Sequence, residues 1–267
     1  MIRLKGTEMA CLENQVAIVT GAGTGIGREA AKMLAAEGAS IVLVGRRPEP
    51  LNAVVDEIKA AGGTATAYPC DLMDTSTIAG VATFTLETYG RIDILVNNAG
   101  FSSKVRSIKY IQPEEWNAVF KVNIEAVYHL TQACLPDMLK RGSGTIITTS
   151  SMSALKPGIL GGSPYCAAKA ASQNFSHGLN SELRNEGIRA TVIIPAEVNT
   201  SILDGRPAPP NADARQLMMQ PEDVARCIHL AATLPQRTVI EELVVSPSYQ
   251  RDMSAEIAIA KTAGAPA

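Results

Sequence analysis

Short apolar runs alternate with longer segments of helical period along almost the whole chain. The runs are rich in β-branched residues and lack strict polar alternation, which is typical of strands buried on both faces of a parallel sheet. They predict strands over 15–20, 40–45, 64–70, 92–98, 145–150, 190–195 and 239–245. The segments between them predict helices over 26–37, 49–61, 74–89, 113–141, 164–186 and 221–233.

Prolines and glycines mark the ends of these predicted helices. Pro113 and Pro221 are each followed by two acidic residues, as expected in the first turn of a helix. Glycines stand where five of the helices should end, at Gly38, Gly62, Gly90, Gly142 and Gly187.

Strict alternation of strand and helix implies right-handed crossovers and a parallel sheet that is covered on both faces. We therefore expect an α/β fold: a single doubly wound, Rossmann-like domain over 15–246 with a seven-stranded parallel sheet. A ligand of such a fold binds beyond the carboxyl ends of the strands.

Three segments have no clear period. Residues 196–220 contain three prolines and are too long for a plain connection, so we interpret them as a functional substrate loop within the domain. Residues 1–14 are interpreted as an N-terminal extension, in which Met9 is an alternative start to Met1, and 247–267 as a peripheral C-terminal tail.

Composition and charge exclude several classes of function. Apolar residues make up 46% of the chain, charged residues 19%, and the net charge is −2 with scattered lysines and arginines. This argues against nucleic acid or an anionic membrane as a partner. The polar start has no signal-like apolar segment, and no run reaches the length of a membrane span.

Cysteine and histidine usage points to a cytoplasmic protein without a metal site. The five cysteines form no CxxC pair and are interpreted as reduced thiols. The three histidines lie far apart and show no zinc-ligand spacing.

A glycine-rich turn, TGAGTGIGRE at 20–29, joins the first predicted strand to the first helix. Gly21, Gly25 and Gly27 would let a pyrophosphate approach the backbone at the start of that helix. The spacing differs from G-x-G-x-x-G, and no P-loop Lys-Ser/Thr follows, so nucleoside triphosphate chemistry is disfavoured. A merely tight turn is the alternative interpretation.

The end of the second predicted strand bears on the choice of cofactor. An NAD site usually places an acid there for the ribose 2′-hydroxyl, but this chain has Arg46 and Arg47. Guanidinium groups bind phosphate in a bidentate manner. We therefore predict NADP(H) rather than NAD(H), with Arg46 on the 2′-phosphate and Arg47 as its helper. The alternative is that both are solvent-facing loop charges.

Tyr165 and Lys169 are four residues apart in a predicted helix, so they share one face. A nearby ammonium stabilises a phenolate and lowers the pKa of the phenol, which suits tyrosine for acid–base work near neutral pH. A lone YxxxK is common by chance, and its significance here depends on the motifs that accompany it.

Those motifs together resemble the compact, single-domain branch of the short-chain dehydrogenase/reductase family. They are TGAGTGIG at 20–27, NNAG at 97–100, Asn123, TSS at 149–151 and YCAAK at 165–169. The likeness covers about residues 14–246, and the motifs are specific as a set although each is weak alone.

The resemblance implies four catalytic residues. Tyr165 would be the general acid/base, and Lys169 would bind the nicotinamide ribose and depress the tyrosine pKa. Ser151 would hydrogen-bond the substrate oxygen, with Ser150 and Ser153 as alternatives. Asn123 would hold a water that links Lys169 to solvent.

The resemblance also implies the cofactor contacts. Asp71 would meet the adenine, Asn97 and Gly100 would line the adenosine and ribose, and Val198 and Thr200 would fix the nicotinamide carboxamide. The full predicted set is Gly21, Thr24, Gly25, Ile26, Gly27, Arg46, Arg47, Asp71, Leu72, Asn97, Ala99, Gly100, Tyr165, Lys169, Pro195, Val198 and Thr200.

The implied function is an NADP(H)-dependent oxidoreductase that acts on a small-molecule ketone or secondary alcohol as a homotetramer or homodimer. A catalytically silent, NADP-sensing or scaffold protein on the same fold is the alternative. The chain is too short for the added substrate region of the family's longer epimerase and dehydratase branch. Ile159, Leu160, Ile202 and Leu203, with Phe101 nearby, predict a modest apolar substrate pocket without charged anchors, and a solvent-exposed lid is the alternative interpretation.

Overall fold

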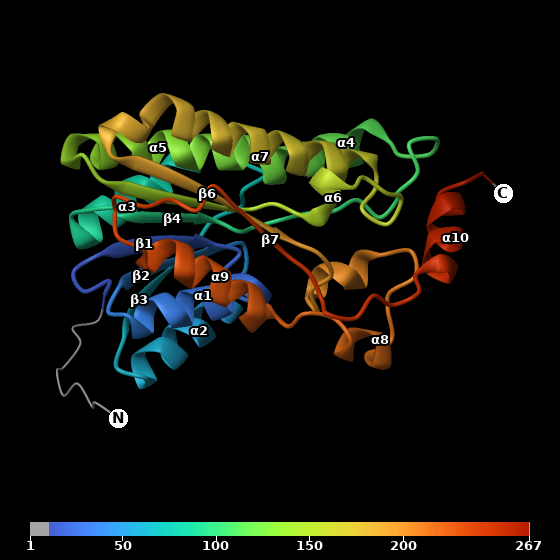
Figure 1. Cartoon of the computed structure of the whole chain (residues 1–267), viewed down its shortest axis with the longest axis horizontal. Coiled ribbons are helices and arrows are strands. Elements are labelled where there is room, and N and C mark those ends of the chain that lie inside the picture. The colour runs from blue at the N-terminus through green and yellow to red at the C-terminus, as the bar shows by residue number, and fades with distance from the viewer. Residues whose placement is uncertain (1–10, 267) are drawn as a thin grey trace.

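A seven-stranded parallel sheet forms the centre of the molecule (Figure 1). The computed structural model describes residues 11–266. The strand order is β3-β2-β1-β4-β5-β6-β7, so the chain winds outward in both directions from the boundary between β1 and β4. The strands are β1 (Val16–Thr20), β2 (Ser40–Gly45), β3 (Thr64–Pro69), β4 (Ile94–Asn97), β5 (Gly144–Thr149), β6 (Ile188–Pro195) and β7 (Glu242–Val245).

Helices cover both faces of this sheet, as Figure 1 shows. One face packs on α1 (Gly25–Ala36), α2 (Pro48–Ala60) and α9 (Pro221–Thr233), and the other on α3 (Ala79–Tyr89), α5 (Ala126–Arg141) and α7 (Ser163–Leu183). Ala17 and Val19 of β1 join the first core, whereas Ile18 between them joins the second, because successive side chains of a strand point to opposite faces. The predicted doubly wound fold is confirmed.

The remaining elements are short. They are α4 (Pro113–Phe120), a π-helical turn η1 (Lys121–Glu125), α6 (Met152–Leu155), the 3₁₀ turns η2 (Arg184–Glu186) and η3 (Ser201–Gly205), α8 (Ala212–Gln216) and α10 (Ser254–Thr262).

Two predicted helices differ from the observed ones for local reasons. The helix expected from 74 begins only at Ala79, because the Asp74 carboxylate accepts bonds from the Ser76 amide and hydroxyl and holds a turn there. The helix expected over 113–141 contains η1, where the buried Asn123 side chain donates a 2.8 Å bond to the Val119 carbonyl oxygen one turn earlier. A π-helical turn within an α-helix often accompanies a functional residue.

The segments without a clear period also acquire structure. The loop 196–220 contains η3 and α8, and the segment after residue 246 contains α10. Of the predicted N-terminal extension, residues 1–10 lie outside the described part of the chain, and with them the question of Met1 or Met9. Leu12 is buried in the core, and its amide donates a 3.0 Å bond to the Glu37 carbonyl oxygen. Within 11–266, no helix combines the length and apolarity needed to cross a bilayer.

Candidate active site

A cavity of about 660 Å³ opens at the carboxyl edge of the sheet. The segments that follow β1, β4, β5 and β6 line it together with the first turn of α7. Twelve of the predicted site residues line this cavity: Gly21, Thr24, Gly25, Ile26, Ala99, Gly100, Ser151, Tyr165, Lys169, Pro195, Val198 and Thr200. The cavity therefore unites the glycine-rich turn with the Tyr-x-x-x-Lys motif, although nearly 140 residues separate them in sequence.

The glycine-rich turn leaves no room for side chains on its inner side. A Cβ at Gly27 would lie 2.4 Å from the Gly21 carbonyl oxygen, and one at Gly21 would lie 3.0 Å from the Ala99 Cα. Thr24 precedes α1 without a side-chain cap, and the first turn of α1 contains no acid. The amide groups and the positive dipole end at this N-terminus therefore suit the pyrophosphate of a dinucleotide.

Asn98 holds the turn in place, a role that sequence reasoning missed. Its side-chain amide donates a 3.0 Å bond to the Thr20 carbonyl oxygen, and its backbone amide donates to the Thr20 hydroxyl. The predicted residue Asn97 instead lies on the other side of β4, outside the cavity lining, 3.4 Å from the Thr131 hydroxyl. The alternation of side chains along β4 and its continuation decides which asparagine of the NNAG motif faces the turn.

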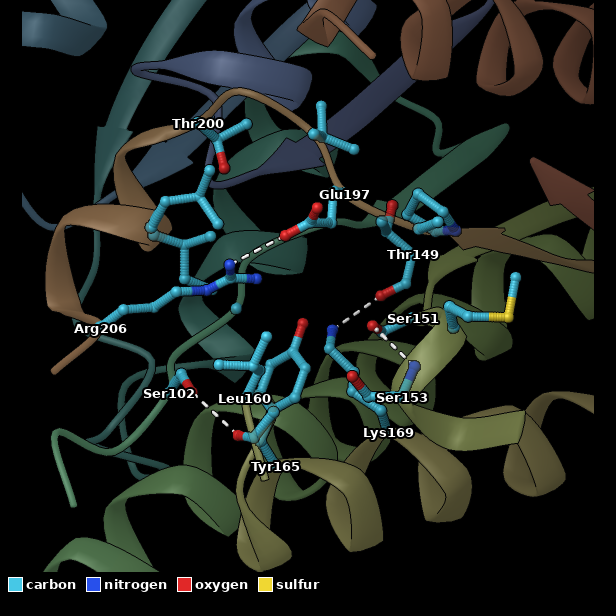
Figure 2. Close-up of a pocket in the computed structure, with 18 of the residues that line it drawn as sticks. Ser102, Thr149, Ser151, Ser153, Leu160, Tyr165, Lys169, Glu197, Thr200 and Arg206 are labelled. Carbon is cyan, nitrogen blue, oxygen red and sulfur yellow. Dashed lines mark hydrogen bonds and ion pairs between the residues drawn. The ribbon is translucent and has the colours of Figure 1, made fainter. Parts of the chain in front are cut away.

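Tyr165, Lys169 and Ser151 point toward one space within the cavity (Figure 2). Burial raises the pKa of the Tyr165 phenol, while a hydrogen bond with Ser151 and the charge of Arg106 act in the opposite direction. The Ser151 oxygen also accepts a 3.1 Å bond from the Ser153 amide, which caps α6 and fixes the hydroxyl at the cavity wall.

Lys169 lies beneath the tyrosine and is 4% exposed. Its ammonium donates a 2.7 Å hydrogen bond to the Thr149 carbonyl oxygen, and burial lowers its pKa to about 8. Lys169 has no salt bridge among residues 11–266, so its charge acts on the cavity without compensation.

The two alternative serines have other partners. Ser150 is buried, and its hydroxyl donates a 3.1 Å bond to the Lys169 carbonyl oxygen. The Ser153 Oγ lies 2.8 Å from where a Cβ on Gly161 would sit, against the loop before α7. All three serines line the cavity. Among them, Ser151 is the one whose hydrogen bond lowers the pKa of Tyr165.

Asn123 lies behind this group, outside the cavity lining but close to it. A Cβ on Gly100 would lie 3.4 Å from the Asn123 Oδ1 and 3.6 Å from the Lys169 Nζ. The Asn123 Oδ1 and the Lys169 Nζ thus both lie beside Gly100. The Asn123 side chain is fixed by a 2.7 Å bond to the Phe101 carbonyl oxygen.

The residues predicted to bind the adenosine lie at the same edge but outside the cavity lining. Arg46 and Arg47 are exposed directly after β2, and Asp71 is exposed just after β3. The backbones of these two segments are joined by a 2.9 Å bond from the Cys70 amide to the Gly45 carbonyl oxygen. Leu72, also in the predicted set, packs into the core beside α3. Arg46 and Arg47 thus follow β2, which is the strand beside β1, and the glycine-rich turn follows β1.

The substrate end of the cavity is charged, and the expectation of an apolar pocket without charged anchors was wrong. Ile159, Leu160, Ile202 and Leu203 do line it, but so do Arg106, Glu197, Arg206 and Arg251. Arg106 follows the NNAG motif, in the segment between β4 and α4. Arg251 comes from the segment after β7, which the sequence predicted to be a peripheral tail.

Three of these charged groups, Glu197, Arg206 and Arg251, form a network with Glu256 of α10. Arg206 donates to Glu197 at 2.9 Å and to Glu256 of α10 at 3.2 Å, and Figure 2 shows the first of these pairs. Arg251 binds Glu197 through two bonds of 2.7 Å and also binds Glu256. Although burial raises the pKa of Glu197, the bonds from Arg251 and Arg206 outweigh it and lower that pKa.

Among the histidine, cysteine, aspartate and glutamate side chains of residues 11–266, no group of three could hold a metal ion.

Comparison with known proteins agrees with this geometry. Residues 15–210 match the family model described as short chain dehydrogenase. An uncharacterized oxidoreductase of Staphylococcus aureus (strain USA300) is 34% identical over 241 residues, which cover 90% of this chain and 100% of that protein.

Two solved structures extend the comparison. A metagenomic short-chain oxidoreductase in complex with NADP has a TM-score of 0.78 and 34% identity, covering 90% of this chain and 100% of its own. A 7α-hydroxysteroid dehydrogenase complexed with NADH and 7-oxo glycochenodeoxycholic acid has a TM-score of 0.82 and 30% identity, covering 91% and 97%. With its glycine-rich turn and its Tyr-x-x-x-Lys motif on one cavity, this chain belongs to the short-chain dehydrogenase family and is an NAD(P)-dependent oxidoreductase.

Proposed function

We propose that the protein transfers hydride between NADP(H) and a ketone or secondary alcohol, with Tyr165 as the general acid/base. The observation that carries this proposal is the convergence of Tyr165, Ser151 and Lys169 on the cavity that begins at the glycine-rich turn. A position for the reacting oxygen beside two hydroxyl donors is what carbonyl reduction requires.

In the reductive direction, the Tyr165 hydroxyl donates its proton to the substrate oxygen as that oxygen becomes alkoxide-like. Ser151 donates a hydrogen bond to the same oxygen, which stabilises the developing charge. The nicotinamide, when bound, supplies the hydride for reduction and accepts it in the reverse reaction. Alcohol oxidation uses the Tyr165 phenolate as the base.

Lys169 has two functions in this proposal. Its ammonium, held at the Thr149 carbonyl oxygen, stabilises the phenolate form of Tyr165 and orients the nicotinamide ribose. Asn123, which lies with Lys169 beside Gly100, supports a proton path from Lys169 toward solvent.

The preference for NADP(H) rests on Arg46. It is exposed immediately after β2, where no acid is present to bind a ribose 2′-hydroxyl. One similar solved structure holds NADP and another holds NADH, so the relatives permit either cofactor. Two adjacent guanidinium groups favour the 2′-phosphate.

The test measures initial rates with NADPH and with NADH, in parallel, on a broad panel of ketones and aldehydes. We expect turnover with NADPH preferred, and Tyr165→Phe should retain NADPH binding by fluorescence but lose at least about 100-fold in kcat. Near-normal turnover in Tyr165→Phe would refute the assignment of the base. Tight NADPH binding without turnover on any panel member would favour the silent, cofactor-sensing alternative.

We further propose a homotetramer in the cytoplasm, with α5 and α7 at a subunit interface. Tyr128 of α5 is exposed on the surface of the α5 and α7 layer, and its ring packs edge-on against Phe175 of α7. Light scattering coupled to gel filtration measures the assembly, and a monomer would contradict it.

A further inference from the structure

Arg106 is a buried cation of the cavity lining and forms no salt bridge with a carboxylate of residues 11–266, although the charge of Glu115 acts on it. It is 2% exposed and lines the cavity beside Ser102. Its Nη1 donates to the Ser102 hydroxyl and, at 3.0 Å, to the Gly161 carbonyl oxygen, and its Nη2 donates to the Gly205 carbonyl oxygen at 3.4 Å. Its Nε has no partner among residues 11–266.

The same cavity contains two arginines that are paired. Arg206 and Arg251 both bind Glu197 and Glu256, so the two cations and two carboxylates of this network balance each other. Arg106 lies close enough to Arg206 for the second guanidinium to repel it, and burial together with that repulsion lowers the pKa of Arg106 to about 10. At neutral pH the group remains charged, and Glu115 acts on it without a direct ion pair.

A purely structural arginine in this chain has different surroundings. Arg189, buried between β5 and the end of α9, donates from all three of its nitrogens, to the Thr145 hydroxyl and to four carbonyl oxygens. Arg106 has fewer acceptors, and one of its nitrogens has none within the described chain. A buried charge without full pairing is unfavourable unless a ligand completes it. The contrast shows that Arg106, unlike Arg189, has hydrogen-bonding capacity that the described chain does not use.

The position of Arg106 connects that acceptor to the reacting oxygen. Its Cδ lies 3.2 Å from where a Cβ on Gly162 would sit, and Gly162 is the residue that caps the helix α7 bearing Tyr165. The charge of Arg106 acts on the Tyr165 hydroxyl. One small molecule can therefore contact both groups from within the same cavity.

We propose that Arg106 binds a carboxylate of the substrate, so that the site acts on keto acids and the corresponding hydroxy acids. A guanidinium offers planar, paired N–H donors that match the two oxygens of a carboxylate. This inference rests on the proposed function, because the carbonyl or alcohol carbon of the same molecule must lie at Tyr165 and Ser151.

The test compares each acid with its neutral isostere. The panel consists of α-, β-, γ- and δ-keto acids, linear and ring-bearing, together with the methyl ester of each, assayed with NADPH. We expect at least one acid to exceed its ester in kcat/KM. In Arg106→Gln, kcat/KM for that acid should fall about 100-fold, while the value for its ester should change less than about threefold.

Two further variants separate anion binding from folding. Lys104→Gln removes the same charge from an exposed position outside the cavity lining, so its effect on the acid should stay below about threefold. Arg106→Lys retains the charge without the paired donors and should recover part of the acid's kcat/KM. If Arg106→Gln does not fold, Arg106→Lys provides the comparison, and an equal loss for acid and ester would overturn the proposal.

A binding measurement distinguishes failure of this inference from failure of the proposed function. Calorimetry with NADPH present titrates the saturated carboxylic acids, which have a methylene in place of the carbonyl, into wild type, Arg106→Gln and Tyr165→Phe. We expect binding that depends on Arg106 and not on Tyr165. Carboxylate binding of this kind without turnover would preserve the anion site and refute the oxidoreductase mechanism. Turnover of esters with no carboxylate bound would refute the anion site alone.

Discussion

The Nζ atom of Lys169 lies 5.7 Å from the centre of the Tyr165 ring, one helical turn away in α7. The lysine reaches this position because its ammonium is held at the Thr149 carbonyl oxygen, at the end of β5. Burial lowers its pKa to about 8, so the ammonium is charged at neutral pH and loses its proton as the pH rises through that value. Lys169 therefore carries its full positive charge only below about pH 8.

Removal of this charge should change the pH dependence of catalysis. In alcohol oxidation the base is the Tyr165 phenolate, so kcat/KM rises with pH. Lys169→Met should move that rise toward alkaline pH, because a phenolate at Tyr165 favours the protonated form of Lys169 and is stabilised by it, which methionine cannot reproduce. Profiles of kcat/KM between pH 6 and 11 test this. The exposed Lys156→Met should leave the profile unchanged, and an unmoved profile in Lys169→Met would exclude the ammonium as the source of the effect.

Gly27→Ala should abolish cofactor binding. The new Cβ would meet the Gly21 carbonyl oxygen at 2.4 Å and the Asn98 Nδ2 at 2.6 Å, so the turn that receives the pyrophosphate must shift. We expect the dissociation constant for NADPH to rise at least about 100-fold, as measured by fluorescence titration.

Gly178→Ala is the matched control for that variant. Gly178 lies within α7, and a Cβ there would contact nothing within 4 Å. Alanine at an open helical position should stabilise the protein by about 0.5–1 kcal/mol and leave NADPH binding intact. A similar loss of binding in both variants would show that the crowding at Gly27 is not the cause.

Arg251→Met should destabilise the fold by about 3 kcal/mol, because it leaves Glu197 and Glu256 with one shared cation in a largely buried site. In contrast, Arg184→Met removes an exposed pair with Glu241 and should cost less than about 1 kcal/mol. Urea unfolding measures both.

The same network should make stability sensitive to acid. The fold lowers the pKa of Glu197, so this carboxylate contributes stability above its ordinary pKa, and the contribution disappears as the pH falls through the lowered value. Wild type should therefore lose more stability than Arg251→Met between pH 6 and pH 3. An equal loss would show that the pKa of Glu197 does not depend on Arg251.

Arg46→Ala should weaken NADPH binding at least about tenfold and leave NADH binding within about twofold, because only the 2′-phosphate engages the guanidinium. Arg47→Ala should show a smaller change in the same direction. Dissociation constants for both cofactors measure the effect. Equal weakening of NADH would assign Arg46 to a structural role.

Most of the sheet was predictable because buried parallel strands and amphipathic helices are determined by local hydrophobic pattern. The segment 40–45 matched β2 at both ends, and 221–233 matched α9. The delayed start of α3 was not predictable from that pattern, because it depends on the hydrogen bonds of the Asp74 carboxylate with Ser76.

The candidate site also contains some residues that local sequence pattern predicts and others that it does not. Tyr165, Lys169 and the glycine-rich turn were found from spacing, because helical and turn geometry place them locally. The hydrogen bonds of Asn98 to Thr20 were not predicted, because the alternation of side chains after β4 gives Asn97 and Asn98 different partners. Arg106 gave no signal, since its significance lies in the absence of a partner that only the folded chain between residues 11 and 266 reveals.

The network around Glu197 joins the end of the chain to the cavity. Arg251 and Glu256 follow all seven strands in the chain, yet they close one wall of the cavity. A chain shortened at β7 would keep the whole sheet and the glycine-rich turn but would lose Arg251 from the opposite wall of the cavity. The last residues of the chain therefore shape the cavity without contributing a strand to the fold that supports it.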